Sequence, residues 1–212
     1  ILPAPTASAF DGLPDSEFRF YTRMHYFGDG YERRCLKGGR QCWKIPIMEG
    51  EYTGEERFGT VKGIAGGNFL VMGKDRQSAL AAAEAGASAI AGMPGVILSF
   101  AGGIVASGSK VGCRNYRFPI PASTNHALCP SLKGIVADSQ VPDGVGAIYE
   151  IVINGLGERE VKHAMKAGIA AAAESGRITH IGASNFGGKL GLYRLRLHGL
   201  FISKDPAKSE HE

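Results

Sequence analysis

The chain has 212 residues, of which 44% are hydrophobic and 21% charged, and its formal net charge at pH 7 is +4. This composition is typical of a globular protein that needs no disulfide staple, and it excludes a largely disordered chain. The basic residues are dispersed, so the charge does not indicate a nucleic-acid partner, and no apolar stretch approaches the roughly 20 residues that span a bilayer. We therefore expect a soluble, cytoplasmic protein without a membrane or nucleic-acid partner.

The first part of the chain reads as antiparallel strands. Large apolar and charged residues alternate over residues 18–27, which predicts a half-buried strand. Glycine-rich turns at residues 28–30 and 37–40 then predict a three-stranded meander that ends near residue 48. The polar residues 55–57 mark a boundary, so we expect one lobe to hold residues 1–57 and another to hold residues 58–201.

The second part predicts strands alternating with two helices. Strands are expected at residues 58–72, 96–100, 147–154, 177–182 and 190–200, and helices at residues 76–91 and 158–175. Asp75 is the predicted N-cap of the first helix. Two β-α-β units, each followed by a further strand, are typical of a ferredoxin-like α+β fold with helices on one face of an antiparallel sheet. Residues 202–212 are expected to form a polar tail.

One carboxylate stands in the middle of the apolar strand at residues 147–154. Its neighbours Ile148 and Val152 share the face of Glu150 and carry no charge. Burial among apolar groups raises the pKa of a carboxyl group, which makes it a usable acid or base near neutral pH. The alternative is that the sheet curls at its edge and Glu150 makes an ordinary ion pair.

The glycine-rich stretch at residues 102–110 has two interpretations. It is not a triphosphate-binding loop, because Ser109 stands where that motif requires lysine. The backbone amides with Ser107, Ser109 and Lys110 could donate to a carboxylate, a phosphate or a polar ring edge. The same glycines could instead serve only the turn geometry of a tight connection.

No metal site is predicted. The four cysteines form no CxxC pair and have no histidine at zinc-binding spacing, and His126, His163 and His180 are scattered. Free thiols are the expected state of the cysteines.

Five separated motifs resemble the formylmethanofuran:tetrahydromethanopterin formyltransferase family. In this chain they read PIMEGEY at 46–52, GIAGGNF at 63–69, GGIVASGSK at 102–110, YEIVINGL at 149–156 and GGKLG at 187–191. The resemblance runs in order to about Phe201. Family members are longer at the N-terminus, so the chain resembles their C-terminal two-thirds, with an incomplete N-terminal lobe.

The resemblance implies two ferredoxin-like lobes, a homo-oligomer, and reversible formyl transfer between the amine of methanofuran and N5 of tetrahydromethanopterin. Both carriers are substrates, and no metal or permanently bound cofactor is implied. Glu150 matches the position of the family's catalytic carboxyl group. The implied substrate-binding residues are Glu49, Glu51, Asn68, Ser107, Ser109, Lys110, Asn154 and Lys189.

The mildly basic charge favours a bacterial source over the strongly acidic archaeal members of the family. In bacteria, the enzyme that the chain resembles is one subunit of a formyltransferase/hydrolase complex. A competing hypothesis is a non-catalytic ferredoxin-like module that binds a small ligand or a protein partner. An exposed, salt-bridged Glu150 would favour that module, because such a module needs no carboxyl group in a core strand.

Overall fold

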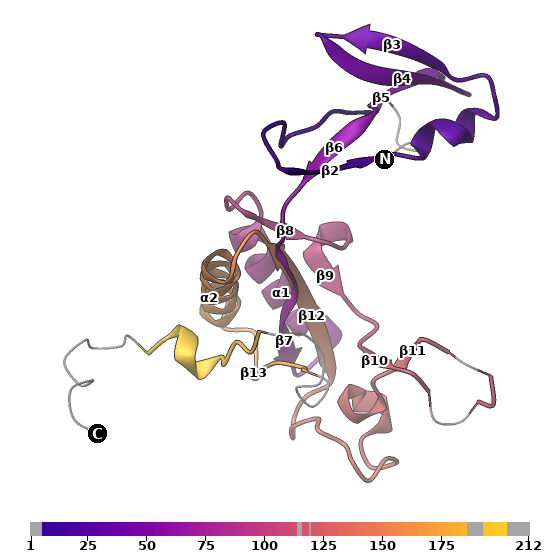
Figure 1. Cartoon of the computed structure of the whole chain (residues 1–212). Coiled ribbons are helices and arrows are strands. Elements are labelled where there is room, and N and C mark those ends of the chain that lie inside the picture. Colours follow the sequence, from indigo (N-terminus) through magenta and orange to yellow (C-terminus); the bar gives the residue numbers. More distant parts are fainter. Residues whose placement is uncertain (1–5, 114–115, 119, 186–192, 203–212) are drawn as a thin grey trace, which may run out of the picture. The chain divides into compact units, whose positions relative to one another are not determined.

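The computed structural model describes residues 6–113, 116–118, 120–185 and 193–202. The chain divides into two compact units, Ile1–Lys62 and Gly63–Glu212 (Figure 1). The division lies five residues beyond the predicted boundary, because strand β6 (Arg57–Thr60) pairs antiparallel with β2 (Phe18–Tyr21) and so belongs to the first unit. Each unit is described by itself.

The first unit contains a four-stranded sheet and a two-stranded ribbon. The sheet has the order β1 (Ser8–Ala9), β5 (Gly50–Glu55), β4 (Arg40–Ile47) and β3 (Arg33–Lys37). Strand β1 runs parallel to β5, and the other pairs are antiparallel. The ribbon is formed by β2 and β6.

The predicted meander is therefore wrong in its first strand. That strand ends at Tyr21, and the 3-10 helix η1 (Met24–Gly28) follows it. Within this helix the His25 ring stacks on the Trp43 ring of β4, with 4.3 Å between the ring centroids. Residues 18–27 thus form a short strand of the β2–β6 ribbon and a helix whose His25 ring packs on the sheet, instead of a strand of that sheet.

The second unit is built on one antiparallel sheet. Its order is β13 (His180–Gly182), β7 (Ile64–Gly73), β12 (Ala147–Gly155) and β8 (Val96–Leu98), and β9 (Ile104–Val105) also pairs with β12. Helix α1 (Arg76–Ile90) connects β7 to β8, and α2 (Glu158–Glu174) connects β12 to β13. Both predicted β-α-β units are thus present, and the Asp75 carboxylate caps α1 by accepting from the Ser78 amide at 2.7 Å.

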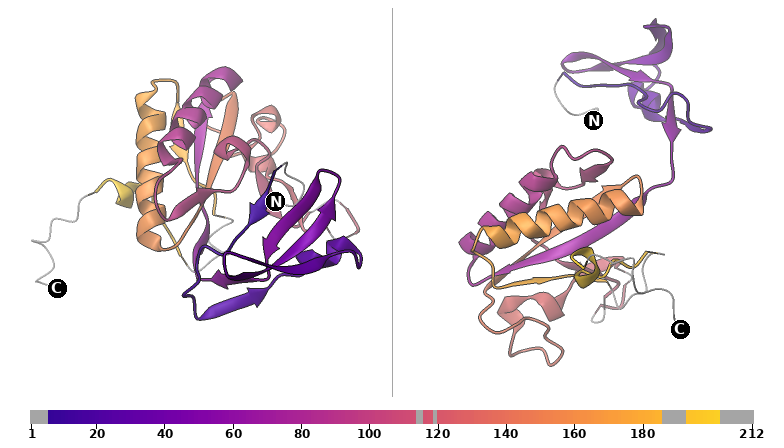
Figure 2. Two further views of the ribbon diagram at one scale, coloured as in Figure 1. Left: turned by 90° about the horizontal axis from the view of Figure 1, so that it is seen from above. Right: turned by 90° about the vertical axis from the view of Figure 1, so that its left-hand side faces the viewer.

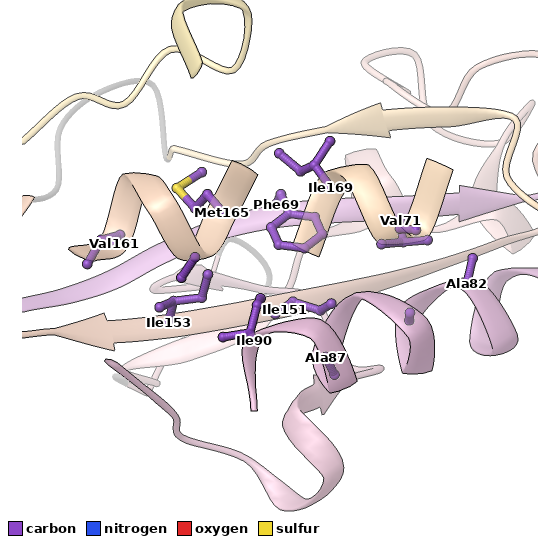
Figure 3. Close-up of a cluster of buried hydrophobic side chains, with 13 residues drawn as sticks. Phe69, Val71, Ala82, Ala87, Ile90, Ile151, Ile153, Val161, Met165 and Ile169 are labelled. Atoms are coloured by element: carbon purple, nitrogen blue, oxygen red, sulfur yellow. The ribbon is translucent and has the colours of Figure 1, made fainter. Parts of the chain in front are cut away.

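Both helices lie on the same face of this sheet (Figures 1 and 2). Between helices and strands lies a continuous apolar core, in which Phe69 and Val71 of β7 and Ile151 and Ile153 of β12 point toward α1 and α2 (Figure 3). Glycine lets the helices approach closely. A Cβ added at Gly168 would lie 2.6 Å from Ile90 Cδ1.

The opposite face of the sheet is covered by the long connection between β9 and β12. Leu70 and Met72 of β7 pack there against Val141 and Val145. The connection carries the hairpin of β10 (Ser109–Val111) and β11 (Ala122–Thr124), and the short helices η3 (His126–Leu128) and η4 (Pro130–Leu132). The nearly continuous apolar pattern of β12 is thus that of a strand covered on both faces.

A final strand was predicted at residues 190–200. The described part of this range, residues 193–200, contains no strand, so the prediction is wrong there. Residues 193–197 have no regular structure, and the 3-10 helix η6 (His198–Leu200) follows them. Leu195, Leu197 and Leu200 nevertheless pack against the core. The alternation of these leucines with polar residues therefore reflects the burial of the leucine side chains, and no strand pairing accompanies it. The polar tail from residue 203 onward lies outside the described residues.

Candidate active site

Glu150 lies at the centre of β12, on the sheet face opposite the helices. Leu70 of β7 and Val105 of β9 lie directly opposite it across the two strand pairs. Directly opposed residues project to the same face of an antiparallel sheet, as do alternate residues of one strand, so Ile148 and Val152 share this face. Four apolar side chains therefore border the carboxyl group.

The surroundings of Glu150 shift its proton equilibrium. Burial raises the pKa of the Glu150 carboxyl, and a hydrogen bond from Asn68 opposes that shift. The side chain is largely but not completely buried, in keeping with the expected setting among apolar neighbours, and the direction of the pKa shift is the predicted one. Within the described ranges no ion pair involves Glu150.

Asn68 connects Glu150 to the end of β13. Its Nδ2 donates to Glu150 Oε1 at 2.9 Å, and its Oδ1 accepts from the backbone amide of Ser184 at 3.4 Å. Only one orientation of the Asn68 side-chain amide makes both hydrogen bonds, so the two bonds together fix that orientation. Ser184 was not predicted from the sequence, because its contribution is a backbone amide that any residue could supply.

A cavity of about 290 Å³ opens beside Asn68. Among the described residues, strand β13 pairs with β7 from Leu70 to Met72, and the cavity lies along the preceding residues 63–68. Its other walls come from Met165 of α2, residues 183–185, Tyr193 and Leu195. Backbone amides and apolar side chains thus line one hollow, which is the usual character of a small-molecule site.

The side chain of Asn154 makes two hydrogen bonds within the second unit. Its Oδ1 accepts from the Gly66 amide at 2.9 Å, and its Nδ2 donates to Ser99 Oγ at 2.6 Å. The register between β7 and β12 shifts here, between Ile153 and Gly155. Asn154 therefore holds a bulge in the sheet, and substrate binding by it stays a prediction.

The glycine-rich connection has a packing explanation. Gly103 has φ +77°, and a Cβ added to it would lie 2.5 Å from Leu98 Cδ1. Ser107 and Ser109 are exposed, while Lys110 Nζ donates to Ser123 Oγ at 2.7 Å. The glycines are thus needed for a close turn, and anion binding by the other three residues stays a prediction.

Glu49 and Glu51 lie in the first unit, at the turn between β4 and β5. The Glu49 carboxylate accepts from the backbone amide of Thr6 at 2.9 and 3.0 Å. Glu51 pairs with Arg33 and, at 3.1 Å, with Lys44. The hydrogen bond from Arg33 lowers the pKa of Glu51, followed by that from Lys44. Both residues have structural partners, and ligand contacts by them stay a prediction.

The sequence also missed a buried polar pair in the first unit. Asp11 and Glu55 are its buried charged residues, and the Asp11 amide donates to Glu55 Oε2 at 2.8 Å. Arg40 pairs with Glu55 at 3.0 Å. Glu55, expected in a polar loop, thus ends strand β5 and anchors the start of the chain to it.

Lys189 lies outside the described residues. In the part of the chain that the structure describes, no group of three histidine, cysteine, aspartate or glutamate side chains could hold a metal ion, and no helix has the length and apolarity to cross a membrane. The site therefore centres on Glu150 and Asn68. Asn68 lines the cavity and Glu150 is bonded to it, and a half-buried carboxyl group with a raised pKa can exchange protons with a nitrogen or oxygen that reaches it.

Comparison with known proteins agrees with the motifs. A model described as formylmethanofuran-tetrahydromethanopterin formyltransferase matches residues 1–47, and one described as the proximal lobe of this enzyme matches residues 50–200. The chain belongs to this formyltransferase family. The second match begins within β5 and includes the whole Glu150 site.

Individual relatives give the same result. The formyltransferases of Methanosarcina mazei and Methanopyrus kandleri are each 50% identical over 95% of this chain and 68% of their own length. The solved formyltransferase of Methanosarcina barkeri is 47% identical with a TM-score of 0.75, covering 94% of this chain and 68% of that one. The formyltransferase/hydrolase complex from Methylorubrum extorquens, solved with methylofuran, contains a chain that is 37% identical with a TM-score of 0.71, covering 89% and 64%.

Proposed function

We propose that this protein transfers a formyl group reversibly between the amine of methanofuran and N5 of tetrahydromethanopterin. The observation that carries the proposal is a family match along nearly the whole chain, with Glu150 in an uncharged setting at the centre of the matched sheet. The two carriers act as substrates, so the reaction needs no permanently bound cofactor. This activity would make the protein an enzyme of one-carbon metabolism in the cytoplasm.

The chemistry is an acyl transfer from one nitrogen to another. The attacking amine adds to the formamide carbonyl carbon, the carbonyl becomes a tetrahedral oxyanion, and the bond to the first nitrogen then breaks. The attacking nitrogen must lose a proton and the leaving nitrogen must gain one. Glu150 suits both steps, since burial keeps its carboxyl group protonated at higher pH than an exposed one. Asn68 holds that group in one orientation.

We further propose that the second unit is one ferredoxin-like lobe. The strand order β13–β7–β12–β8, with a helix inside each β-α-β unit, supports this assignment. The first unit would belong to a separate N-terminal lobe, in line with the expected division between residues 1–57 and 58–201. A homo-oligomer is part of the same proposal. In a bacterium, other subunits of a formyltransferase/hydrolase complex would be its partners.

The uncharged surroundings of Glu150 argue against a non-catalytic binding module. Such a module gains nothing from a carboxyl group that is half-buried among four apolar side chains, because that burial costs free energy whenever the group ionises.

The test is the Glu150→Gln variant, assayed in a protein of full family length. Glutamine keeps the shape and can still bond to residue 68, but it cannot exchange a proton. Formyl transfer should fall by about 10² to 10⁴ while both carriers still bind. Glu84→Gln, on an exposed position of α1, is the matched control and should keep normal turnover. A Glu150→Gln enzyme with normal turnover would make Glu150 a structural residue.

A further inference from the structure

Two cysteines face each other across the hairpin of β3 and β4. Cys35 of β3 is the direct register partner of Cys42 of β4. The turn that sets this register is Gly38-Gly39, with φ +58° and +78°. Positive φ at both central residues is the signature of a type I′ turn, which joins two antiparallel strands in a single register.

The register fixes the distance between the two cysteines. Lys37 and Arg40 flank the two-residue turn and form a hydrogen-bonded pair, so Cys35 and Cys42, two positions away, form another. The Cα atoms of such a pair lie about 5.5 Å apart, near the usual separation in a disulfide. Directly opposed side chains also project to the same face of the sheet.

The electrostatics of Cys42 agree with this proximity. Burial is the largest influence and raises the pKa of the Cys42 thiol, and the neighbouring Cys35 and Glu55 raise it further. Glu55 is the register partner of Cys42 on its other side, in β5. The three side chains therefore form a row across β3, β4 and β5.

The two thiols differ in access. Cys42 is 1% exposed, whereas Cys35 is half-buried on β3, the last strand of the described sheet. A small oxidant in solution would therefore meet Cys35 first. The other two cysteines, Cys113 and Cys129, lie in the second unit and belong to no strand.

We propose that Cys35 and Cys42 are an oxidation site that closes to a disulfide with hydrogen peroxide as the oxidant. The Cys35 thiol loses its proton, its sulfur attacks one peroxide oxygen, the O–O bond breaks, and the departing hydroxide takes up that proton, so a sulfenic acid and one water result. The Cys42 thiol likewise loses its proton, its sulfur attacks the Cys35 sulfur, and the departing hydroxide takes up the proton as the second water. Two thiols and one peroxide give one disulfide and two waters, and the bond ties β3 to β4 at their native register.

The hairpin sequence makes the product easy to identify. Trypsin cleaves after Arg34, Lys37, Arg40 and Lys44, so Cys35 and Cys42 leave on two short peptides, residues 35–37 and 41–44. Without reduction these peptides stay together only if a disulfide joins them. After peroxide treatment of the native protein, we expect that linked pair by mass spectrometry. We also expect the number of alkylatable thiols to fall from the four of the sequence to about two.

Three variants separate this site from general oxidation. Cys113→Ser should leave the linked pair unchanged, and Cys35→Ser should abolish it. Cys42→Ala should leave Cys35 as a sulfenic acid that dimedone traps. The proposal is overturned if peroxide leaves both thiols alkylatable, drives Cys35 to higher oxides while Cys42 stays a thiol, or links Cys35 to another cysteine.

Discussion

The proton equilibrium of Glu150 is set by two opposing neighbours. Burial among apolar side chains favours the neutral acid, and the hydrogen bond donated by Asn68 favours the carboxylate. Burial is the larger influence. Asn68 therefore keeps the pKa of Glu150 below the value that burial alone would give, so the two residues act as one site.

Replacing Asn68 with valine should raise the pKa of Glu150 further. Valine removes the donor and adds apolar surface, so both effects favour the neutral acid. Carbon-detected NMR titration of the Glu150 carboxyl should give a higher midpoint in the variant, and the pH–rate profile of formyl transfer should move to higher pH in parallel. Gln77→Val, on the exposed side of α1, is the control. A lower pKa in Asn68→Val would show that Asn68 does not stabilise the carboxylate.

The raised pKa also makes stability depend on pH. Because the folded chain holds the Glu150 proton more tightly than the unfolded chain does, the contribution of this group is fully present below the unfolded pKa. It is lost as pH rises through the folded pKa. Urea midpoints from pH 4 to 8 should therefore fall more with rising pH for the wild type than for Glu150→Gln. Parallel pH dependence of the two proteins would contradict the shift.

At the scale of single residues, the sequence predicted the raised pKa of the Glu150 carboxyl group but not the hydrogen bond that Asn68 donates to it. The raised pKa followed from Ile148 and Val152, which are close along the chain. The bond from Asn68 depends on the register between β7 and β12, whose strands are about 80 residues apart in sequence. No local pattern carries that information.

At the scale of elements, the connection through Gly102 and Gly103 offers a matched pair. Both residues have positive φ, +66° and +77°. A Cβ at Gly102 would meet nothing within 4 Å, whereas one at Gly103 would also lie 3.2 Å from Ala87 Cβ of α1. The first glycine is therefore required by backbone conformation alone, and the second also by packing.

Alanine substitutions should separate these two requirements. Gly102→Ala should cost about 1–2 kcal/mol of unfolding free energy from the left-handed backbone, and Gly103→Ala about 1–3 kcal/mol more from overpacking. Denaturant unfolding of both variants measures the difference. Equal losses would mean that Leu98 and α1 move aside without cost.

Helices were predicted better than strand pairings. The ends of α1 and α2 lie within one residue of the predicted ends, because capping and helical periodicity are local signals. The strand predicted at residues 18–27 was overextended, and none forms over residues 193–200, since alternation reports burial on one side and not the presence of a partner strand.

At the scale of the whole molecule, the two units have very different cores. Among the described residues, the buried apolar side chains of the first unit are Cys42, Ile45 and Tyr52, whereas the second unit has the extended cluster between its sheet and helices. Buried apolar area is the main source of stability, so the first unit should unfold more easily. The predicted division of the chain came from composition, but its position depended on the pairing of β6 with β2.

Two spectroscopic probes separate the units in a single urea titration. Trp43 is the only tryptophan of the chain and lies in β4, so its fluorescence reports the first unit. The long helices α1 and α2 both belong to the second unit, so the circular dichroism at 222 nm reports mainly that unit. We expect the fluorescence midpoint to come at least about 0.5 M urea before the dichroism midpoint.

Core variants assign each transition to its unit. Ile45→Ala should lower only the fluorescence midpoint, and Ile151→Ala only the dichroism midpoint, because each removes about 2–5 kcal/mol from one core. Both side chains are fully buried, so the two truncations are comparable. Coincident transitions that move together in both variants would show one cooperative unit, and the division after Lys62 would then have no thermodynamic meaning.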